Sequence, residues 1–239
     1  MFALHQTSAA RTQSISFEAV SAERSHLRLV AITPPTRTMQ KHEVVFRAGD
    51  PAANLVEVVE GAVMVYQFLE DGRRQVVDLV LPGGICGFSS GDGLYPSTGE
   101  ALRRSVIRSH SRSEAAGSIE FRERLAAFAQ RQICLLHQHA VTLGRKTAGE
   151  RVCSLLMRFM EANFGSAALN GPAPLAGWPL DLPMTRGEMG DYLGLSLETV
   201  CRTLTDLRQK AMIEIGRKQG EMRIRNLNQL RSVAGLEAA

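Results

Sequence analysis

The sequence predicts an α+β fold: a β-roll of the jelly-roll type, then a long helix, then a C-terminal winged helix-turn-helix. Three observations support this prediction. Short β-branched runs separated by tight turns fill residues 39–107, and an apolar heptad pattern without proline or glycine follows over residues 118–143. Residues 185–209 then contain two short helix patterns joined by a turn with glycine. At 239 residues, of which 44% are hydrophobic, the chain is long enough for two packed domains.

The beginning of the chain is polar and small and has no periodic apolar pattern. We therefore expect a mobile N-terminal extension over residues 1–25. It contains no apolar segment of the kind that a secretory signal needs. No stretch of the chain approaches the roughly 18 consecutive apolar residues of a membrane helix. These features predict a cytoplasmic protein without a membrane partner.

Residues 26–117 are predicted to form the β-roll, an effector-type domain. Turn signals such as Glu60-Gly61 and Asp71-Gly72 separate its short strands. Evenly spaced short strands with tight turns are typical of an antiparallel barrel or jelly roll. The runs rich in valine, isoleucine and leucine are residues 44–46, 55–59, 63–66, 76–80 and 105–107.

Residues 118–144 are predicted to form one long helix with a narrow apolar stripe. Alanines in the stripe allow two helices to approach closely, which favours packing against the same helix of a second copy in a two-fold homodimer. The alternative is a helix whose stripe packs on its own β-roll. The stripe residues recur at spacings of three and four and are Ala126, Ala129, Ile133, Leu136, Ala140 and Leu143.

The remaining residues, 145–239, are predicted to form the winged helix-turn-helix domain. Its first helix is expected to begin at about residue 145 or 147 and to end at Asn163. A loop rich in alanine, glycine and proline follows over residues 165–177, and a short strand is expected at residues 180–182.

The helix-turn-helix itself is predicted from caps and glycines. Thr185 is a good N-cap, and Glu188 three residues later completes a capping box. Gly190 lies where the two helices must approach closely, and Gly194 lies where a left-handed turn residue is needed. Ser196 is the N-cap of the second helix.

One face of this second helix carries residues suited to reading DNA. Glu198, Cys201 and Arg202 lie at positions i, i+3 and i+4, so they share the face that points away from the core. Arginine can donate two hydrogen bonds to guanine, and glutamate can accept one from the cytosine amino group. With Leu197, these residues are the candidates for contact with base edges. The alternative is a surface Glu–Arg ion pair, which contributes little energy.

The chain after the second helix is basic. Residues 211–224 predict a β-hairpin with a basic tip, the wing, whose side chains would contact phosphates without sequence preference. Residues 196–231 hold eight Lys and Arg against four Asp and Glu, so a net charge of +4 is concentrated there. The candidate contacts with the DNA backbone are Thr185, Ser196, Thr199, Arg217 and Lys218.

These motifs resemble the CRP/FNR superfamily of transcription regulators along most of the chain. Residues 195–204 (LSLETVCRTL) resemble its recognition motif, and residues 81–88 (LPGGICGF) resemble its effector-domain loop. The resemblance implies a β-roll of the cyclic-nucleotide-binding type, a dimerisation helix and a winged helix. It also implies a homodimer that binds palindromic double-stranded DNA and contacts RNA polymerase.

Differences from the motifs of other branches indicate which branch of the superfamily the chain resembles. Where cyclic-AMP-binding members carry Gly-Glu, this chain has Gly87-Phe88, and Arg103 or Arg104 fits their phosphate clamp poorly. Residues 1–40 lack cysteine, so no iron–sulfur sensor is expected. The chain most resembles the FixK-type branch. This branch implies an activator of microaerobic, denitrification or nitrogen-fixation genes that binds a TTGAT-N4-ATCAA-like site and needs no cofactor.

The resemblance also implies roles within the recognition helix. Arg202 is expected to read the guanine of the TGA core, and Glu198 the paired cytosine. Position 201 usually holds serine, whereas Cys201 here lies near a helix N-terminus in a basic region, which favours a reactive thiolate. Oxidation adds bulk and negative charge beside phosphates, so we hypothesise that oxidation of Cys201 blocks DNA binding. The alternative is that cysteine is only a small residue that fits there.

Other chemistries have less support. The four cysteines form no C-x2-C pair, and the six histidines show no metal-ligand spacing. Cys134 and His137 share a helix face that His139 does not join, so no metal site is predicted. No nucleophile–base pair is visible, and an enzyme is not expected.

Two further hypotheses remain open. A regulator of the same superfamily could be gated by haem with nitric oxide, or by another effector in the β-roll. The small apolar C-terminus, Gly235 to Ala239, resembles tails that Clp-type proteases recognise.

Overall fold

The structure, a computed structural model, describes residues 34–218 and 220–236. The predicted extension over residues 1–25 and the last three residues of the C-terminal tail lie outside the described part. Among the described helices, none combines the length and the apolar character that a membrane span requires.

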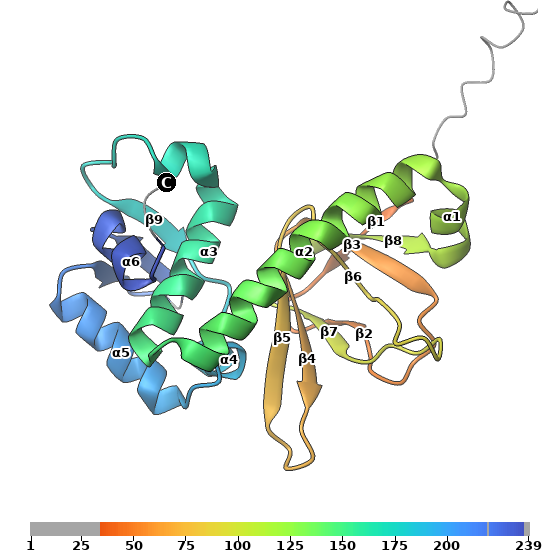
Figure 1. The fold of residues 1–239 in the computed structure, drawn as a ribbon, viewed down its shortest axis with the longest axis horizontal. Coiled ribbons are helices and arrows are strands. Elements are labelled where there is room, and N and C mark those ends of the chain that lie inside the picture. Colours follow the sequence, from red (N-terminus) through yellow and green to blue (C-terminus); the bar gives the residue numbers. More distant parts are fainter. Residues whose placement is uncertain (1–33, 219, 237–239) are drawn as a thin grey trace, which may run out of the picture. The chain divides into compact units, whose positions relative to one another are not determined.

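Eight strands of the described residues form the N-terminal β-roll (Figure 1). They make two antiparallel sheets, in the orders β1-β8-β3-β6 and β2-β7-β4-β5. An apolar cluster that includes Phe46, Val58 and Ile107 joins the two sheets, so the predicted two-layer roll is confirmed. The strands are β1 Thr36–Met39, β2 Val44–Phe46, β3 Asn54–Glu60, β4 Val63–Phe68, β5 Arg74–Val80, β6 Ile85–Cys86, β7 Thr98–Ala101 and β8 Ser105–Ser111.

A short helix, α1 (Arg112–Gly117), leads into the long helix α2 (Ile119–Arg145). Ser118 is the N-cap of α2, and its hydroxyl accepts a hydrogen bond from the Phe121 backbone N–H at 3.2 Å. Phe121 and Phe128 are buried in one cluster with Leu55 of β3. One face of α2 therefore packs on the roll, and the helix runs from there to the C-terminal domain (Figure 1).

The next helix, α3 (Ala148–Leu169), is longer than predicted. The sequence predicted an end at Asn163 and a loop over residues 165–177. Gly165 does break the helix, with φ 74°, but one more helical turn follows and buries Leu169 in the core. The short strand also begins earlier than predicted, because β9 (Trp178–Asp181) pairs along its whole length with β11.

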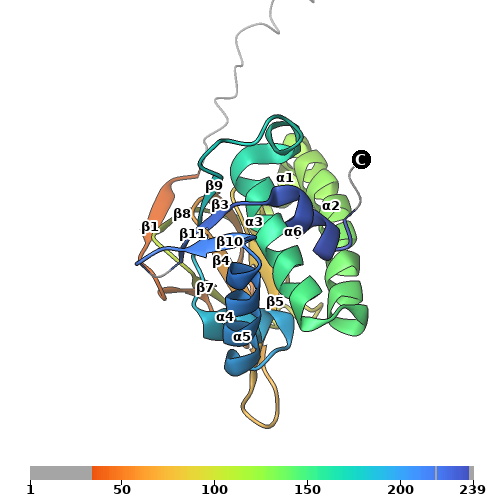
Figure 2. The ribbon, with the colours of Figure 1, turned by 90° about the vertical axis from the view of Figure 1, so that its left-hand side faces the viewer.

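In the described part of the chain, the C-terminal domain combines four helices, α3 to α6, with a small antiparallel sheet in the order β10-β11-β9. Leu156 and Met160 of α3 pack with Leu193, Leu204 and Ile224 in its core. Helix α5 lies on the outer side of this domain in both views (Figures 1 and 2). The elements are α4 Arg186–Leu193, α5 Leu197–Gln209, β10 Ile213–Ile215, β11 Glu221–Ile224 and α6 Leu227–Val233.

Polar contacts connect the β-roll with the C-terminal domain. Arg74 of β5 forms an ion pair with Asp191 of α4 at 2.8 Å. Arg158 of α3 donates a hydrogen bond to the Leu79 carbonyl at 2.7 Å. Met64 and Leu79 of the roll also belong to the apolar cluster of the C-terminal domain, so the two parts share core residues.

Candidate DNA-binding surface

Side-chain caps fix both helices of the helix-turn-helix. The hydroxyl of Thr185 accepts from the Glu188 backbone N–H at 3.1 Å, and the Glu188 carboxylate accepts from the Thr185 N–H at 2.6 Å. The hydroxyl of Ser196 accepts from the Thr199 N–H at 3.2 Å. Each cap satisfies a backbone donor that the helix leaves without a partner. The hydroxyls thereby lie at the N-termini of α4 and α5.

Two glycines set the turn between these helices. Gly194 adopts the left-handed conformation with φ 62° and ψ 40° and ends α4. A Cβ on Gly190 would lie 2.5 Å from the Leu195 carbonyl oxygen, closer than any side chain allows. The Leu195 backbone N–H instead donates to the Gly190 carbonyl at 3.0 Å. The sequence-based expectation of a close approach at Gly190 is therefore met.

Helix α5 has one buried face and one free face. Val200, Leu204 and Leu207 are buried against the core. Leu197 is 57% exposed, and Glu198 and Arg202 are exposed. Within the described part of the chain, the side chains of Glu198 and Arg202 have neither a hydrogen-bond partner nor an ion pair. The alternative from the sequence, a surface ion pair between Glu198 and Arg202, is therefore not formed in the structure, and both side chains are exposed.

The thiol of Cys201 is the reactive candidate on this surface. Burial raises the pKa of the Cys153 thiol to about 12 and also raises the pKa of Cys86. Cys201 is half-buried on α5, and Nη1 of Arg186 lies 3.3 Å from its sulfur. Sequence reasoning missed this arginine, although it directly follows the first N-cap of the motif. The guanidinium donates a hydrogen bond to the sulfur at this distance.

The wing is a hairpin of β10 and β11 with Arg217 and Lys218 exposed at its tip. The Lys218 backbone N–H donates to the Glu221 carboxylate at 3.2 Å. Among the described residues, the side chains of Arg217 and Lys218 have no hydrogen-bond or ion-pair partner. Not all of the basic stretch is free for DNA. Arg225 donates to the Ala176 carbonyl at 2.7 Å, so it contributes to the fold of the domain.

The predicted apolar stripe on α2 lies mostly outside the contact with the β-roll. Ile133 and Leu136 are 53% and 43% exposed, and Ala126 and Ala140 are exposed as well. Ala129 and Leu143 are half-buried. The helix packs on its own roll mainly through other residues, among them Phe121 and Phe128, so most of the stripe is not used in the alternative packing on the roll.

A cavity of about 360 Å³ lies between the β-roll and α2. Val65, Phe88 and Leu136 are among its mostly apolar lining, and Asp78 lies in its wall, where its carboxylate accepts from Gln132 at 2.5 Å. A carboxylate in an apolar cavity disfavours a phosphate ligand. Two basic residues near the expected clamp position do not line the cavity: Arg103 pairs with Asp181 at 3.0 Å, and Arg104 is exposed.

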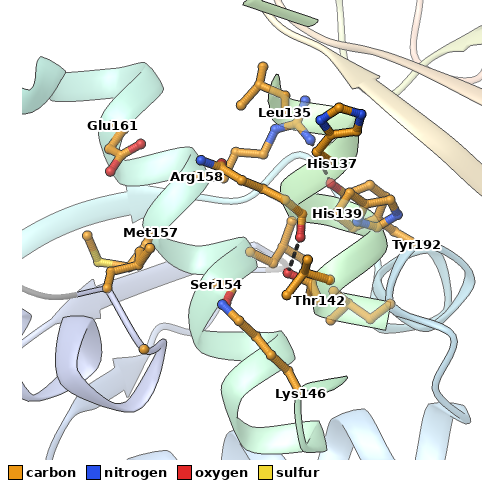
Figure 3. Close-up of a pocket in the computed structure, with 16 residues that line it drawn as sticks. Leu135, His137, His139, Thr142, Lys146, Ser154, Met157, Arg158, Glu161 and Tyr192 are labelled. Carbon is orange, nitrogen blue, oxygen red and sulfur yellow. Dashed lines mark hydrogen bonds between the residues drawn. The ribbon is translucent and has the colours of Figure 1, made fainter. Parts of the chain in front are cut away.

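A second cavity, of about 460 Å³, lies between α2, α3 and α4 (Figure 3). His139 stacks on Tyr192 with ring centroids 4.1 Å apart, and Arg158 donates to the Tyr192 hydroxyl at 2.6 Å. Burial, and then the charge of Arg158, lower the pKa of His139 to about 4. Cys134 and His137 are exposed, and neither forms a metal-ligand group with His139 among the described residues.

Comparison with known proteins identifies the family to which this architecture belongs. Residues 36–117 match the family profile of the cyclic nucleotide-binding domain, and residues 150–233 match that of the Crp-like helix-turn-helix domain. An effector-type roll followed by such a helix-turn-helix defines a class of DNA-binding transcription regulators. The chain belongs to the CRP/FNR family of these regulators, in its FixK-type branch, as its motifs predicted.

Two relatives and two solved structures support this assignment. The chain is 32% identical over 213 residues to the nitrogen fixation regulation protein FixK of Rhizobium meliloti, which covers 89% of this chain and 91% of that protein. It is also 32% identical over 177 residues to FixK of Bradyrhizobium diazoefficiens, covering 72% and 71%. FixK2 from Bradyrhizobium japonicum superposes with a TM-score of 0.69 at 32% identity, over 86% of this chain and 98% of that one. A CRP-family regulator of Thermus thermophilus gives a TM-score of 0.70 at 24% identity, over 85% and 100%, and shows the fold alone.

Proposed function

We propose that this protein is a homodimeric activator that binds a TTGAT-N4-ATCAA-like palindrome and controls microaerobic, denitrification or nitrogen-fixation genes. The observation that carries the proposal is the free face of α5, where Glu198 and Arg202 are exposed and have no partner among the described residues. In a major groove, Arg202 donates two hydrogen bonds to guanine and Glu198 accepts from the paired cytosine. Leu197 and Cys201 lie beside them and contact neighbouring base edges.

Contacts with the DNA backbone position this helix. Thr185, Ser196 and Thr199 lie at helix N-termini, where N–H groups and the helix dipole favour a phosphate. Arg217 and Lys218 at the wing tip add affinity without sequence preference. These contacts fix the register from which α5 reads the bases.

The palindrome requires two copies of the recognition helix, one helical turn of DNA apart. The stripe on α2 supports pairing of two chains, because its exposed apolar and small side chains suit a close two-fold helix contact. The stripe comprises Ala126, Ala129, Ile133, Leu136, Ala140 and Leu143. As an activator in the cytoplasm, the dimer would contact RNA polymerase, and its C-terminal tail would be a recognition point for a Clp-type protease.

Cys201 supports redox control of the proposed DNA binding. Peroxide transfers one oxygen atom to a thiolate, which gives a sulfenate and water and adds an oxygen to the face that meets DNA. Nη1 of Arg186 lies 3.3 Å from this sulfur, so the reacting thiol has a basic side chain as its neighbour. The proposed result is that oxidised protein leaves its site.

A second candidate function is a ligand-gated regulator of the same family. The apolar cavity between the β-roll and α2 favours it, because a ligand there would contact both the roll and the stripe residue Leu136. One candidate effector is nitric oxide bound through haem. An absorbance spectrum shows whether the purified protein contains haem.

The test measures anisotropy of a labelled duplex carrying TTGAT-N4-ATCAA at fixed salt. Loss of a bidentate contact costs about 1–3 kcal/mol in each half-site, so Arg202→Ala should weaken dimer binding by at least about 30-fold. Arg122→Ala, which removes an equal charge from the exposed N-terminal part of α2, is the control and should bind as the wild type does. Equal binding by both variants would exclude the proposed reading of guanine.

The redox arm compares reduced and peroxide-treated protein. Peroxide should abolish binding of the wild type and of Cys134→Ser, which lacks the other accessible thiol. It should spare Cys201→Ser. Wild-type binding that survives peroxide would rule out the switch. Reduced protein without specific binding would instead favour the ligand-gated function.

A further inference from the structure

Three side chains with metal-ligating atoms meet where the β-roll contacts the helix-turn-helix. They are His42 in the loop after β1, Glu100 in β7 and Glu188 in α4. Nδ1 of His42 lies 2.8 Å from one oxygen of Glu100 and 3.8 Å from Oε1 of Glu188. The ligand atoms of all three residues lie within 4.8 Å of one another.

The charges of this cluster are not balanced by the protein alone. Glu100 and Glu188 are 9% and 3% exposed, and burial of two neighbouring carboxylates is costly without positive partners. In the described part of the chain, the imidazole of His42 is the one basic side chain within ion-pair distance of either carboxylate. Oε1 of Glu188 has no hydrogen-bond donor among the described residues. This oxygen lies 3.8 Å from Nδ1 of His42 and can accept a further partner there.

Each ligand is held in place by contacts outside the group. The Tyr66 hydroxyl donates to the second oxygen of Glu100 at 3.2 Å. Oε2 of Glu188 accepts from the backbone of Thr185 at 2.6 Å, as part of the cap of α4. His42 has a left-handed backbone, with φ 64°, and its N–H donates to a β7 carbonyl at 2.7 Å. Metal ligands with such supporting hydrogen bonds are preorganised for binding.

We propose that His42, Glu100 and Glu188 bind a divalent transition-metal ion, with zinc as the best representative of the class. An imidazole nitrogen with two carboxylate oxygens is a ligand set that zinc accepts, with one further position left for water. The ion would lie between Nδ1 of His42 and the oxygens of Glu100 and Glu188, and its positive charge would offset both buried carboxylates. A ligand set without sulfur also suits other divalent ions of the first transition row.

The site bridges two functional parts of the chain. His42 and Glu100 belong to the β-roll, whereas Glu188 belongs to the first helix of the helix-turn-helix. An ion held by all three residues fixes α4 against the roll, next to the ion pair of Arg74 with Asp191. Because an ion that binds one arrangement better than others shifts the population toward it, metal binding would bias how the recognition helix is presented.

The experiment titrates the full-length protein with zinc chloride by calorimetry, after treatment with a chelator. The exposed thiols are removed first, in a background of Cys134→Ser with Cys201→Ser, because thiolates also bind zinc. Single variants of the three ligands are then compared. His42→Asn keeps a residue that tolerates the left-handed backbone, and Glu188→Gln keeps a side chain that can cap the helix, so both should fold. Glu100→Gln completes the set.

We expect one zinc ion per chain in the background protein, and an affinity at least about 10-fold weaker in each ligand variant, as even a lost supporting hydrogen bond commonly has this effect. Tyr66→Phe should weaken binding through the lost support of Glu100. Asp191→Asn removes the neighbouring ion pair and no ligand, so it should bind zinc as the background does. A rise in the melting temperature with zinc should appear in the background and in Asp191→Asn, and be absent from the ligand variants.

Two results would overturn the proposal. The first is no stoichiometric zinc binding by the background protein. The second is unchanged affinity in folded ligand variants, which would place the ion elsewhere. Neither measurement involves DNA, so a negative result would contradict the metal site without contradicting the proposed binding to DNA.

Discussion

Replacement of Gly190 by alanine should destabilise the protein although it adds a better helix former to α4. The reason is local geometry: a Cβ at this position would lie 2.5 Å from the carbonyl oxygen of Leu195. That oxygen belongs to the backbone of the turn, so it cannot move aside as a flexible side chain would. The turn must shift by several tenths of an ångström and weaken the 3.0 Å hydrogen bond between Leu195 and Gly190.

Two opposing free energies determine the size of the effect. Alanine in place of glycine within a helix gains up to about 1 kcal/mol. Overpacking at a tight contact costs about 1–3 kcal/mol. Gly187 lies in the same helix, and a Cβ there would meet nothing closer than 3.8 Å. Gly190→Ala should therefore be about 1–3 kcal/mol less stable than Gly187→Ala.

The assay is urea unfolding of both variants at one protein concentration, since dimerisation makes apparent stability depend on concentration. A second measurement, binding to the palindromic duplex, should show a loss for Gly190→Ala alone, because the angle between α4 and α5 changes. Equal stability of the two variants would refute the argument from close approach.

Two further predictions concern the junction of α2, α3 and α4. Arg151 donates hydrogen bonds to three backbone carbonyls around the ends of α2 and α4, at 2.7 to 2.9 Å, so Arg151→Met should lower the free energy of unfolding by about 2–3 kcal/mol. Arg145→Met, at an exposed neighbour, should have little effect, and a similar loss in both variants would contradict the role of these bonds. The pKa of His139 is lowered from 6.5 to about 4, so the unfolded chain binds a proton at this histidine more readily than the folded chain does. The free energy of unfolding is therefore unaffected by this group above pH 6.5 and falls as the pH drops toward 4. His139→Phe, which can still stack on Tyr192, should show a flatter decline in urea unfolding across this range, and an unchanged decline would assign the acid sensitivity to other groups.

Much of the fold followed from local sequence patterns. The strongly β-branched runs, such as residues 76–80, became strands, whereas β7 (Thr98–Ala101) was not predicted. Its sequence, TGEA, has little strand preference, and it is a strand because it pairs with β2 on one side and β4 on the other. The extra turn of α3 after Gly165 escaped prediction for a similar reason, since burial of Leu169 in the core supports it.

The helix-turn-helix was the most predictable region, because its signals are local. Thr185 and Ser196 cap helices through backbone groups three residues away, and Gly190 and Gly194 satisfy requirements of the backbone itself. The net charge of the basic stretch was a poorer guide. Arg225 in that stretch is used inside the domain, and only its contact with the Ala176 carbonyl reveals this.

The sequence by itself determined the order of the elements, the caps and glycines of the helix-turn-helix and the residues on the free face of α5. These depend on spacings of two to four residues along one helix or turn. Only the tertiary structure decided which distant residues meet, as Arg186 meets Cys201. It also gathered His42, Glu100 and Glu188 into one group, although each is separated from the next by more than fifty residues. Such contacts depend on how the β-roll packs against the C-terminal domain, and no local pattern records that packing.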